Sequence, residues 1–173
     1  MVLPRLAALE PSANKPCYIS DRVIPSREGR RFLMDTHNNR VPRKVIVPQV
    51  WADFYEETRI PAAVIVGETL RLTGHTGDAA DGSFSADPET QIRQVFHNIQ
   101  FTLFEAGADW SDVVEINSYH VGLLKQAQAV LRVAAEFLVD PYPAWTAVGV
   151  TELIVAEAIV EISCVAVIPT GMR

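Results

Sequence analysis

Hydrophobic and polar residues alternate in the last apolar stretch of the chain, residues 159–168, and this alternation predicts a β-strand. Val160, Ile162 and Cys164 lie on one face of that strand. The other face has Glu161 at a position where a core strand would have an apolar residue. Because burying an unpaired carboxylate is costly, we expect Glu161 to be paired, hydrated or placed at a cleft. Glu161 is therefore the first candidate for a functional residue.

Two stretches have apolar residues at helical spacing. The first follows the helix start Asp87-Pro88-Glu89, which offers an N-cap acceptor and a proline at the first helical position, and it ends at Gly107. The second covers residues 123–138 and ends before a proline. Between them, residues 113–121 are rich in β-branched and aromatic side chains, which predicts a strand.

Shorter β-prone runs complete the pattern. Residues 63–66 and 69–73 lie on either side of Gly67-Glu68 and predict a hairpin. Residues 143–148 predict a further strand, and residues 45–55 a short strand followed by a helical turn. The order of hairpin, helix, strand, helix and two strands predicts an α+β fold of two layers, with both helices on one face of the sheet.

The chain of 173 residues is long enough for one globular domain with a core. Residues 1–60 contain many prolines and little periodicity, so we expect an N-terminal arm with short elements, followed by a domain over 61–169 and a tail at 170–173. A sheet with helices on one face only would expose Val165 and Val167 in a monomer. An oligomer that covers them is therefore expected.

Charge and composition exclude several classes of function. Fifteen Lys and Arg against 21 Asp and Glu give a net charge of −6, which argues against a nucleic-acid or anionic-membrane surface. No apolar run is long enough for a membrane span, and the first ten residues do not resemble a signal peptide, so we expect a cytoplasmic protein. Cys17 and Cys164 lie far apart and are expected to be reduced thiols.

Metal and phosphate sites are not expected. The four histidines show no short ligand spacing, and the chain has no cysteine pair. Gly74-His75-Thr76-Gly77 is not followed by a helix that begins with Lys-Ser or Lys-Thr, so it is not a phosphate-binding loop.

Several short motifs, in this order and spacing, resemble the RidA family, which is also called YjgF/YER057c/UK114. The resemblance runs from Ala62 to Pro169. It rests on Gly67-Glu68, Thr73-Gly74, Asp87 with Gln91, Gln94 and Asn98-Ile99, Glu105-Ala106-Gly107, Asp112-Val113-Val114, Pro143-Ala144, Val160-Glu161-Ile162 and Ala166-Val167. It implies a chorismate-mutase-like fold and a homotrimer whose sheets form a central barrel, with clefts between subunits. Typical members hydrolyse reactive enamines or imines, such as 2-aminoacrylate, without a cofactor.

The resemblance also shows where this chain departs from the family. Gly74 and Glu161 match, and Glu161 corresponds to the glutamate that positions the attacking water. Trp145 stands where members have an arginine that binds the substrate carboxylate through two hydrogen bonds. The other changed cleft positions are Thr73 for serine, Leu131 for asparagine, Ala147 for cysteine and Ile60 for tyrosine. Because the arginine is lost, ordinary deamination of 2-aminoacrylate is not expected.

Glu161 and His75 are the candidate catalytic residues. His75, with an ordinary pKa near ~6.5, would act as general acid or base beside Glu161, although a lone histidine in such a loop is more often only a turn residue. The candidate substrate-binding residues are Thr73, Gly74, Trp145, Leu131 and His120. Trp145 offers an apolar surface for an aromatic ligand or simply fills the cleft, and His120 has a structural role as its alternative.

Two hypotheses follow for the function. The first is a cofactor-free hydrolase or deaminase acting on an imine, an enamine or a related C–N compound, which requires an open cleft and a perturbed pKa at Glu161. The second is a trimer that binds or senses a small molecule without chemistry. In that case Trp145 or the N-terminal arm would fill the cleft.

Overall fold

The computed structural model describes residues 31–34 and 41–168. Most of the expected arm, Cys17 and the expected tail therefore lie outside the described residues. Residues 31–34 form a strand, although the sequence indicated only an extended arm there.

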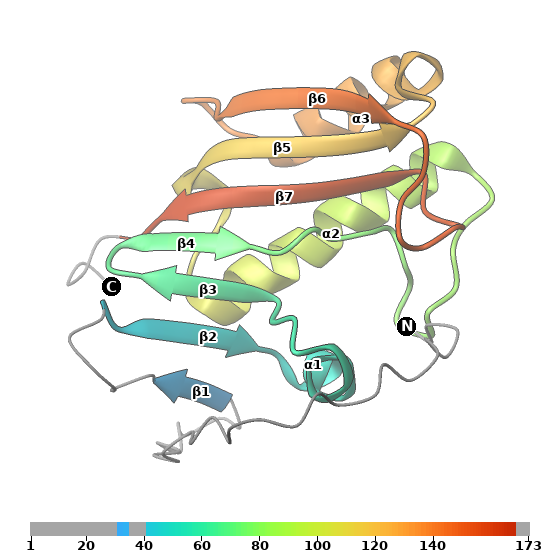
Figure 1. The fold of residues 1–173 in the computed structure, drawn as a ribbon. Helices are drawn as coiled ribbons and strands as arrows, with labels where there is room; N and C mark the ends of the chain where they lie inside the picture. The colour runs from blue at the N-terminus through green and yellow to red at the C-terminus, as the bar shows by residue number, and fades with distance from the viewer. Residues whose placement is uncertain (1–30, 35–40, 169–173) are drawn as a thin grey trace.

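One mixed sheet organises the described part of the chain (Figure 1). Its strands run in the order β1-β2-β3-β4-β7-β5-β6, and neighbouring strands are antiparallel except for the parallel pair β5 and β6. The strands are β1 (Arg31–Met34), β2 (Arg43–Val47), β3 (Ala63–Val66), β4 (Thr69–Leu72), β5 (Val113–Val121), β6 (Ala144–Val150) and β7 (Val160–Val167). The expected hairpin is β3 and β4.

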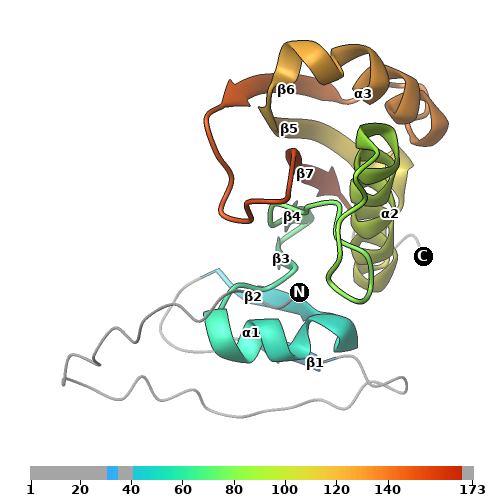
Figure 2. The same cartoon turned by 90° about the vertical axis from the view of Figure 1, so that its right-hand side faces the viewer.

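The helices of the described ranges are α1 (Ala52–Thr58), α2 (Pro88–Ala106) and α3 (Leu123–Phe137), with short 3-10 turns η1 (Gln49–Trp51) and η2 (Trp110–Asp112). Figure 2 shows α2 and α3 together on one side of the sheet, whereas α1 lies near the β1–β2 end. The expected α+β fold is confirmed, while the trimer and its barrel remain predictions. Not one of these helices is both long and apolar enough to cross a bilayer.

Helix α2 begins and ends as its sequence indicates. The Asp87 side chain accepts a hydrogen bond from the Thr90 backbone N–H at 2.8 Å, and Pro88 occupies the first turn. Gly107 ends the helix with a φ of 82°, a conformation that favours glycine. Between these ends, Ile92, Val95, Phe96, Ile99 and Leu103 are fully buried against the sheet. The position of α2 is thus fixed by both its caps and its apolar face.

Strand β7 lies in the middle of the sheet between β4 and β5. Two parallel neighbours need a crossover connection, and α3 supplies it between β5 and β6. The chain then returns to place β7 beside β5. On its helix-covered face, Val160, Ile162, Cys164 and Ala166 are at most 2% exposed, as their alternation predicts. The opposite face of β7, which contains Glu161, is covered by neither α2 nor α3.

The domain boundary expected at residue 60 stays a prediction, but the sheet continues across it. Strand β2 pairs with β3 from Arg43 opposite Val66 to Ile46 opposite Ala63. Ile46 is 2% exposed and belongs to the main core. Residues 43–47 therefore fold as part of the same sheet as the later strands.

Candidate functional site

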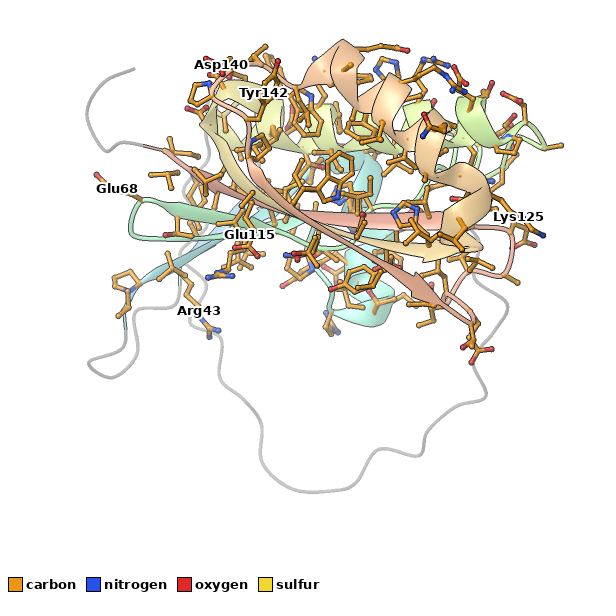
Figure 3. All side chains as sticks on the ribbon, turned by 90° about the horizontal axis from the view of Figure 1, so that it is seen from above. Arg43, Glu68, Glu115, Lys125, Asp140 and Tyr142 are labelled. Atoms are coloured by element: carbon orange, nitrogen blue, oxygen red, sulfur yellow. The ribbon has the colours of Figure 1, made fainter. Side chains whose placement is uncertain are left out.

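Glu161 lies near the start of the central strand β7 and alternates with core residues, so it lies on the face of the sheet opposite the core and the helices. Its neighbours Val160 and Ile162 point the other way and are fully buried in the core. In the register of β5 and β7, Glu161 is opposite Tyr119. Glu115 on β5 is opposite Val165, which alternates with the buried residues of β7 as Glu161 does. Figure 3 shows the side chain of Glu115 projecting away from the helices. The acidic residue thus faces the space in which a second molecule could sit.

Gly74 lies directly beneath the Glu161 side chain. The segment after β4 pairs with β7, because His75 N–H donates to Ile162 O at 2.8 Å and Ile162 N–H donates to His75 O at 3.0 Å. A Cβ atom added to Gly74 would lie 2.7 Å from Glu161 Cδ and 2.8 Å from Cγ, and closer still to Oε1. Such distances are far below van der Waals contact. Position 74 must therefore lack a side chain for Glu161 to occupy this place.

The environment of Glu161 changes its acidity. The side chain is half-buried, and loss of hydration raises the pKa of its carboxyl group above the ordinary value. Among the residues that the structure describes, none forms a hydrogen bond or an ion pair with this carboxylate. A carboxyl group with a raised pKa is suited to accept and return a proton nearer to neutral pH. This agrees with the perturbed Glu161 that the hydrolase hypothesis requires.

Thr73 is held by the chain segment that precedes β3. Its hydroxyl donates to Pro61 O at 2.6 Å, and its backbone N–H donates to Ala62 O at 3.0 Å. The hydroxyl proton is therefore used within the protein, and a ligand would meet Thr73 Oγ1 only as an acceptor.

His75 does not share the site with Glu161. Its ring is 2% exposed, and Nδ1 and Nε2 lie 2.7 Å from Thr73 O and 2.8 Å from Thr102 Oγ1. Because a carbonyl only accepts, Nδ1 carries the proton and Nε2 accepts from the Thr102 hydroxyl. Burial lowers the pKa of His75 to about 4, so the ring is neutral. We expected His75 at the cleft rim, but the structure places it in the core, where Trp51 packs on it with ring centroids 5.0 Å apart.

The buried pair of His75 and Thr102 leads to a stability prediction. Thr102 is 1% exposed, so Thr102→Val keeps the volume but leaves His75 Nε2 without a donor. We expect a loss of about 1–3 kcal/mol in the free energy of unfolding, measured by urea denaturation. Thr102→Ser keeps the hydroxyl and serves as the control. Equal losses in the two variants would show that the hydrogen bond is not what stabilises this position.

Trp145 and His120 belong to a chain of hydrogen bonds on the helix side of the sheet. Trp145 Nε1–H donates to Ser118 Oγ at 2.8 Å, and Ser118 Oγ lies 2.9 Å from His120 Nε2. His120 Nδ1 in turn lies 3.4 Å from Gln126 Oε1 on α3. Trp145 is half-buried and packs against the core, with its ring centroid 6.4 Å from that of Phe96. These contacts hold the indole in place and leave only part of its surface for a ligand.

The predicted binding residues therefore form two groups within one chain. Gly74 and Glu161 meet on the uncovered face of the sheet. Trp145, His120 and Leu131 lie on the helix side, where His120 is fully buried and Leu131 on α3 is 59% exposed. Register supports this division, because Trp145 is opposite Ile116, which faces the core. The sheet separates the two groups, so a single copy does not bring them into one cleft.

Tyr119 is a site residue that sequence reasoning missed. It is opposite Glu161 on β5, and its side chain is 38% exposed on the uncovered face. Alternation along residues 113–121 places Tyr119 on the face opposite His120 and Ser118, but only the register between β5 and β7 brings it beside Glu161. The candidate site thus combines a carboxyl group, a glycine backbone and a phenol ring. Within the described ranges, no three His, Cys, Asp or Glu residues are placed to hold a metal ion.

Comparisons with known proteins agree with this fold. A family model described as Endoribonuclease L-PSP matches residues 50–168. The chain is 36% identical over 114 residues to the RutC family protein YjgH of Escherichia coli, a match that covers 65% of this chain and 87% of the relative. It is 34% identical over 108 residues to a 2-iminobutanoate/2-iminopropanoate deaminase of Dermatophagoides farinae, covering 61% and 83% of the two chains.

A similar solved structure is that of RidA from the Antarctic bacterium Psychrobacter. It superposes with a TM-score of 0.59 at 31% sequence identity, and the match covers 62% of this chain and 87% of the other. The matched part of that structure is thus nearly its full length, whereas more than a third of this chain lies outside the match.

Proposed function

Because the chain belongs to the endoribonuclease L-PSP family, the RidA/YjgF group, we propose that it is a cofactor-free hydrolase of an imine, an enamine or a related C–N compound. The observation that carries this proposal is the half-buried carboxyl group of Glu161, which lies over Gly74 without a partner in the described part of the chain. One relative is named as an imine deaminase, which makes the reaction class reasonable.

The proposed reaction uses Glu161 as a proton carrier. Its carboxylate takes a proton from a water molecule while the water oxygen forms a bond to the carbon of the C=N group, and the π electrons move to nitrogen. Starting from the protonated imine, this step gives a neutral carbinolamine and a protonated Glu161, which returns its proton to the nitrogen. The C–N bond then breaks as the carbinolamine hydroxyl gives its proton to the Glu161 carboxylate, and the ammonia or amine that leaves takes up that proton. The oxygen remains as a carbonyl. A raised pKa at Glu161 suits both proton transfers.

A complete cleft requires more than one copy of the chain. Trp145 and Leu131 are separated from Glu161 by the sheet, so they would join it only across an interface between subunits. We propose a homotrimer for this reason and because the uncovered face includes Val148 and Val167, each 40% exposed in one copy. Sedimentation equilibrium tests this part of the proposal, and a stable monomer would contradict it.

The substrate of this cleft differs from 2-aminoacrylate. Trp145 occupies the position of the carboxylate-binding arginine, and its indole N–H is already used by Ser118. Together with Leu131 it offers an apolar surface, which suits an aromatic or aliphatic substituent. We do not propose the endoribonuclease activity that the family name describes, because the net charge of −6 disfavours the binding of RNA.

The experiment measures ammonia release from a panel of imines and enamines with aromatic and aliphatic substituents. We expect the wild type to turn over at least one of them and Glu161→Gln to lose about 100-fold or more, because it cannot accept a proton. Glu57→Gln, on the exposed side of α1, is the matched control. Equal turnover in the wild type and in Glu161→Gln would contradict the proposed role.

One observation favours a second candidate function, a trimer that binds a small molecule without chemistry. The indole of Trp145 is packed against Phe96 and hydrogen-bonded to Ser118, so it fills part of the cleft that the arginine leaves open in typical members. In this case one or more compounds of the panel would raise the melting temperature of the protein without release of ammonia. The increase would be the same in the wild type and in Glu161→Gln.

A further inference from the structure

The uncovered face around Glu161 has a distribution of charge that bears on the ligand. Tyr119 is opposite Glu161 on β5, and Val148 is opposite Tyr119 on β6. On the other side of Glu161 the segment that includes Gly74 pairs with β7. This row therefore combines one carboxyl group, one aromatic ring and apolar atoms.

Arg71 on β4 and Arg43 on β2 lie on that face of the sheet, and the register places both of them away from Glu161 along the strands. Arg71 on β4 is opposite Val165, which is four positions along β7 from Glu161, or about 13 Å at the usual rise of a strand. Val165 also pairs with Glu115 on β5, the strand on the other side of β7. An acidic side chain therefore lies in the same cross-strand row as Arg71. Arg71 therefore offers little attraction to an anion bound beside Glu161.

The carboxyl group itself leans toward Gly74 and away from Tyr119. The Glu161 Cγ and Cδ atoms occupy the volume that a Cβ atom at position 74 would need, and this sets the direction of the side chain. Glu161 and Tyr119 are cross-strand neighbours, and Cβ atoms in such pairs lie about 4.5–5.5 Å apart. A small planar group above this pair would contact the carboxylate on one side and the phenol ring on the other.

We propose that this face binds a planar cationic C–N group, such as a protonated imine or an amidinium, between the Glu161 carboxylate and the Tyr119 ring. The carboxylate supplies the opposite charge, and the face of an aromatic ring attracts a cation. The inference rests on the proposed function in that it assigns a ligand class to the same site. It selects protonated imines of apolar amines or ketones over imino acids, whose carboxylate would meet Glu161 without a nearby cation.

Binding of the cation also affects the protonation of Glu161. Burial raises the pKa of its carboxyl group, so part of the population is protonated and uncharged as the pH falls toward that value. The cation binds the ionised form, and its affinity therefore rises with pH through the pKa of Glu161. Other ionisable side chains on this face are Tyr119, Glu115, Arg71 and Arg43. On β6, the cross-strand neighbours of Tyr119 and Asn117 are Val148 and Thr146, which do not titrate.

The test uses three probes of one shape: benzamidine, which is cationic, benzamide, which is neutral, and benzoate, which is anionic. Their affinities for the full chain are measured by calorimetry. We expect benzamidine to bind at least about tenfold more tightly than the other two, and Glu161→Gln to abolish that preference. Benzamidine affinity should rise with pH in the wild type and be independent of pH in Glu161→Gln.

Variants of Tyr119 separate the ring from the hydroxyl. Tyr119→Phe keeps the aromatic face and should keep the affinity for benzamidine, whereas Tyr119→Leu should lose about fourfold. Tyr142→Leu, on a loop residue that is 70% exposed and lies on the helix side in Figure 3, is the matched control.

The outcomes distinguish this inference from the proposed reaction. Tighter binding of benzoate, or equal or absent binding of all three probes, overturns the cation site whether or not imines are hydrolysed. Binding of benzamidine that depends on Glu161, together with no turnover of any imine, supports the cation site and contradicts the hydrolase.

Discussion

Gly77→Ala is expected to lower the free energy of unfolding by about 3 kcal/mol, because the added methyl group would overlap the backbone of α2. A Cβ atom at position 77 would lie 2.7 Å from Gln91 Cγ and 3.0 Å from its carbonyl carbon, and closer to the carbonyl oxygen. That carbonyl belongs to the first turns of a helix whose start is fixed by the Asp87 cap. The backbone cannot move away without breaking these contacts.

The side chain of Gln91 makes the overlap more costly. Its Nε2 donates to Ser85 O and Glu157 O, each at 3.2 Å, and its Oε1 accepts from Ile159 N–H at 2.7 Å. Gln91 is 3% exposed, so a displaced side chain would leave these partners without water to replace it. Gly77→Ala therefore disturbs the segment 85–91 and the approach to β7 together.

Urea denaturation measures this effect, with Gly149→Ala as the control. A Cβ atom at position 149 would lie 3.7 Å from Leu123 Cβ, an ordinary contact, so the same chemical change should alter stability by less than about 1 kcal/mol. A loss in Gly77→Ala no larger than that in Gly149→Ala would show that α2 accommodates the methyl group.

Gly74→Ala, three residues earlier, is expected to remove the function while largely preserving the fold. Here the overlap is with Cγ, Cδ and Oε1 of a side chain that can rotate outward, not with backbone. The expected result is a loss of turnover and of benzamidine binding as large as in Glu161→Gln, about 100-fold in turnover. Stability should fall by about 1 kcal/mol, since a half-buried side chain moves into solvent.

A double-mutant cycle in stability tests the cause. In Glu161→Ala the atoms that collide with position 74 are absent, so adding Gly74→Ala should cost nothing or stabilise slightly through the unfolded chain. The coupling between the two positions then equals the cost of Gly74→Ala alone. Additive losses would mean that Glu161 does not lie over Gly74.

Most of the fold could be predicted from local sequence because its signals are local. The N-cap of α2, Gly107 at its end, the hairpin around Gly67 and the alternation of β7 each depend on a few neighbouring residues. The pairing of β2 with β3 was not predicted. The paired strands β2 and β3 are separated in the chain by α1. The short apolar run 45–47 has no sequence pattern that indicates which strand it pairs with.

The sequence identified the main residues of the candidate site, but it did not predict how all of the site residues are arranged in space. Glu161 and Gly74 were identified from alternation and from the family resemblance, and they lie together. His75 was expected beside them because it follows Gly74 in the chain, yet adjacent residues on an extended segment face opposite sides. His75 therefore lies with Ile162 and Thr102 in the core. Tyr119 was missed because its place depends on register.

The contact between Glu161 and Gly74 also constrains how this sequence can diverge. The acid occupies the volume that any side chain at position 74 would need, so the two positions cannot drift independently. A descendant that gains a side chain at 74 first displaces the acid, whereas one that first loses the acid is free to accept many residues at 74. A side chain at position 74 in a related chain therefore indicates that the acid no longer occupies this place.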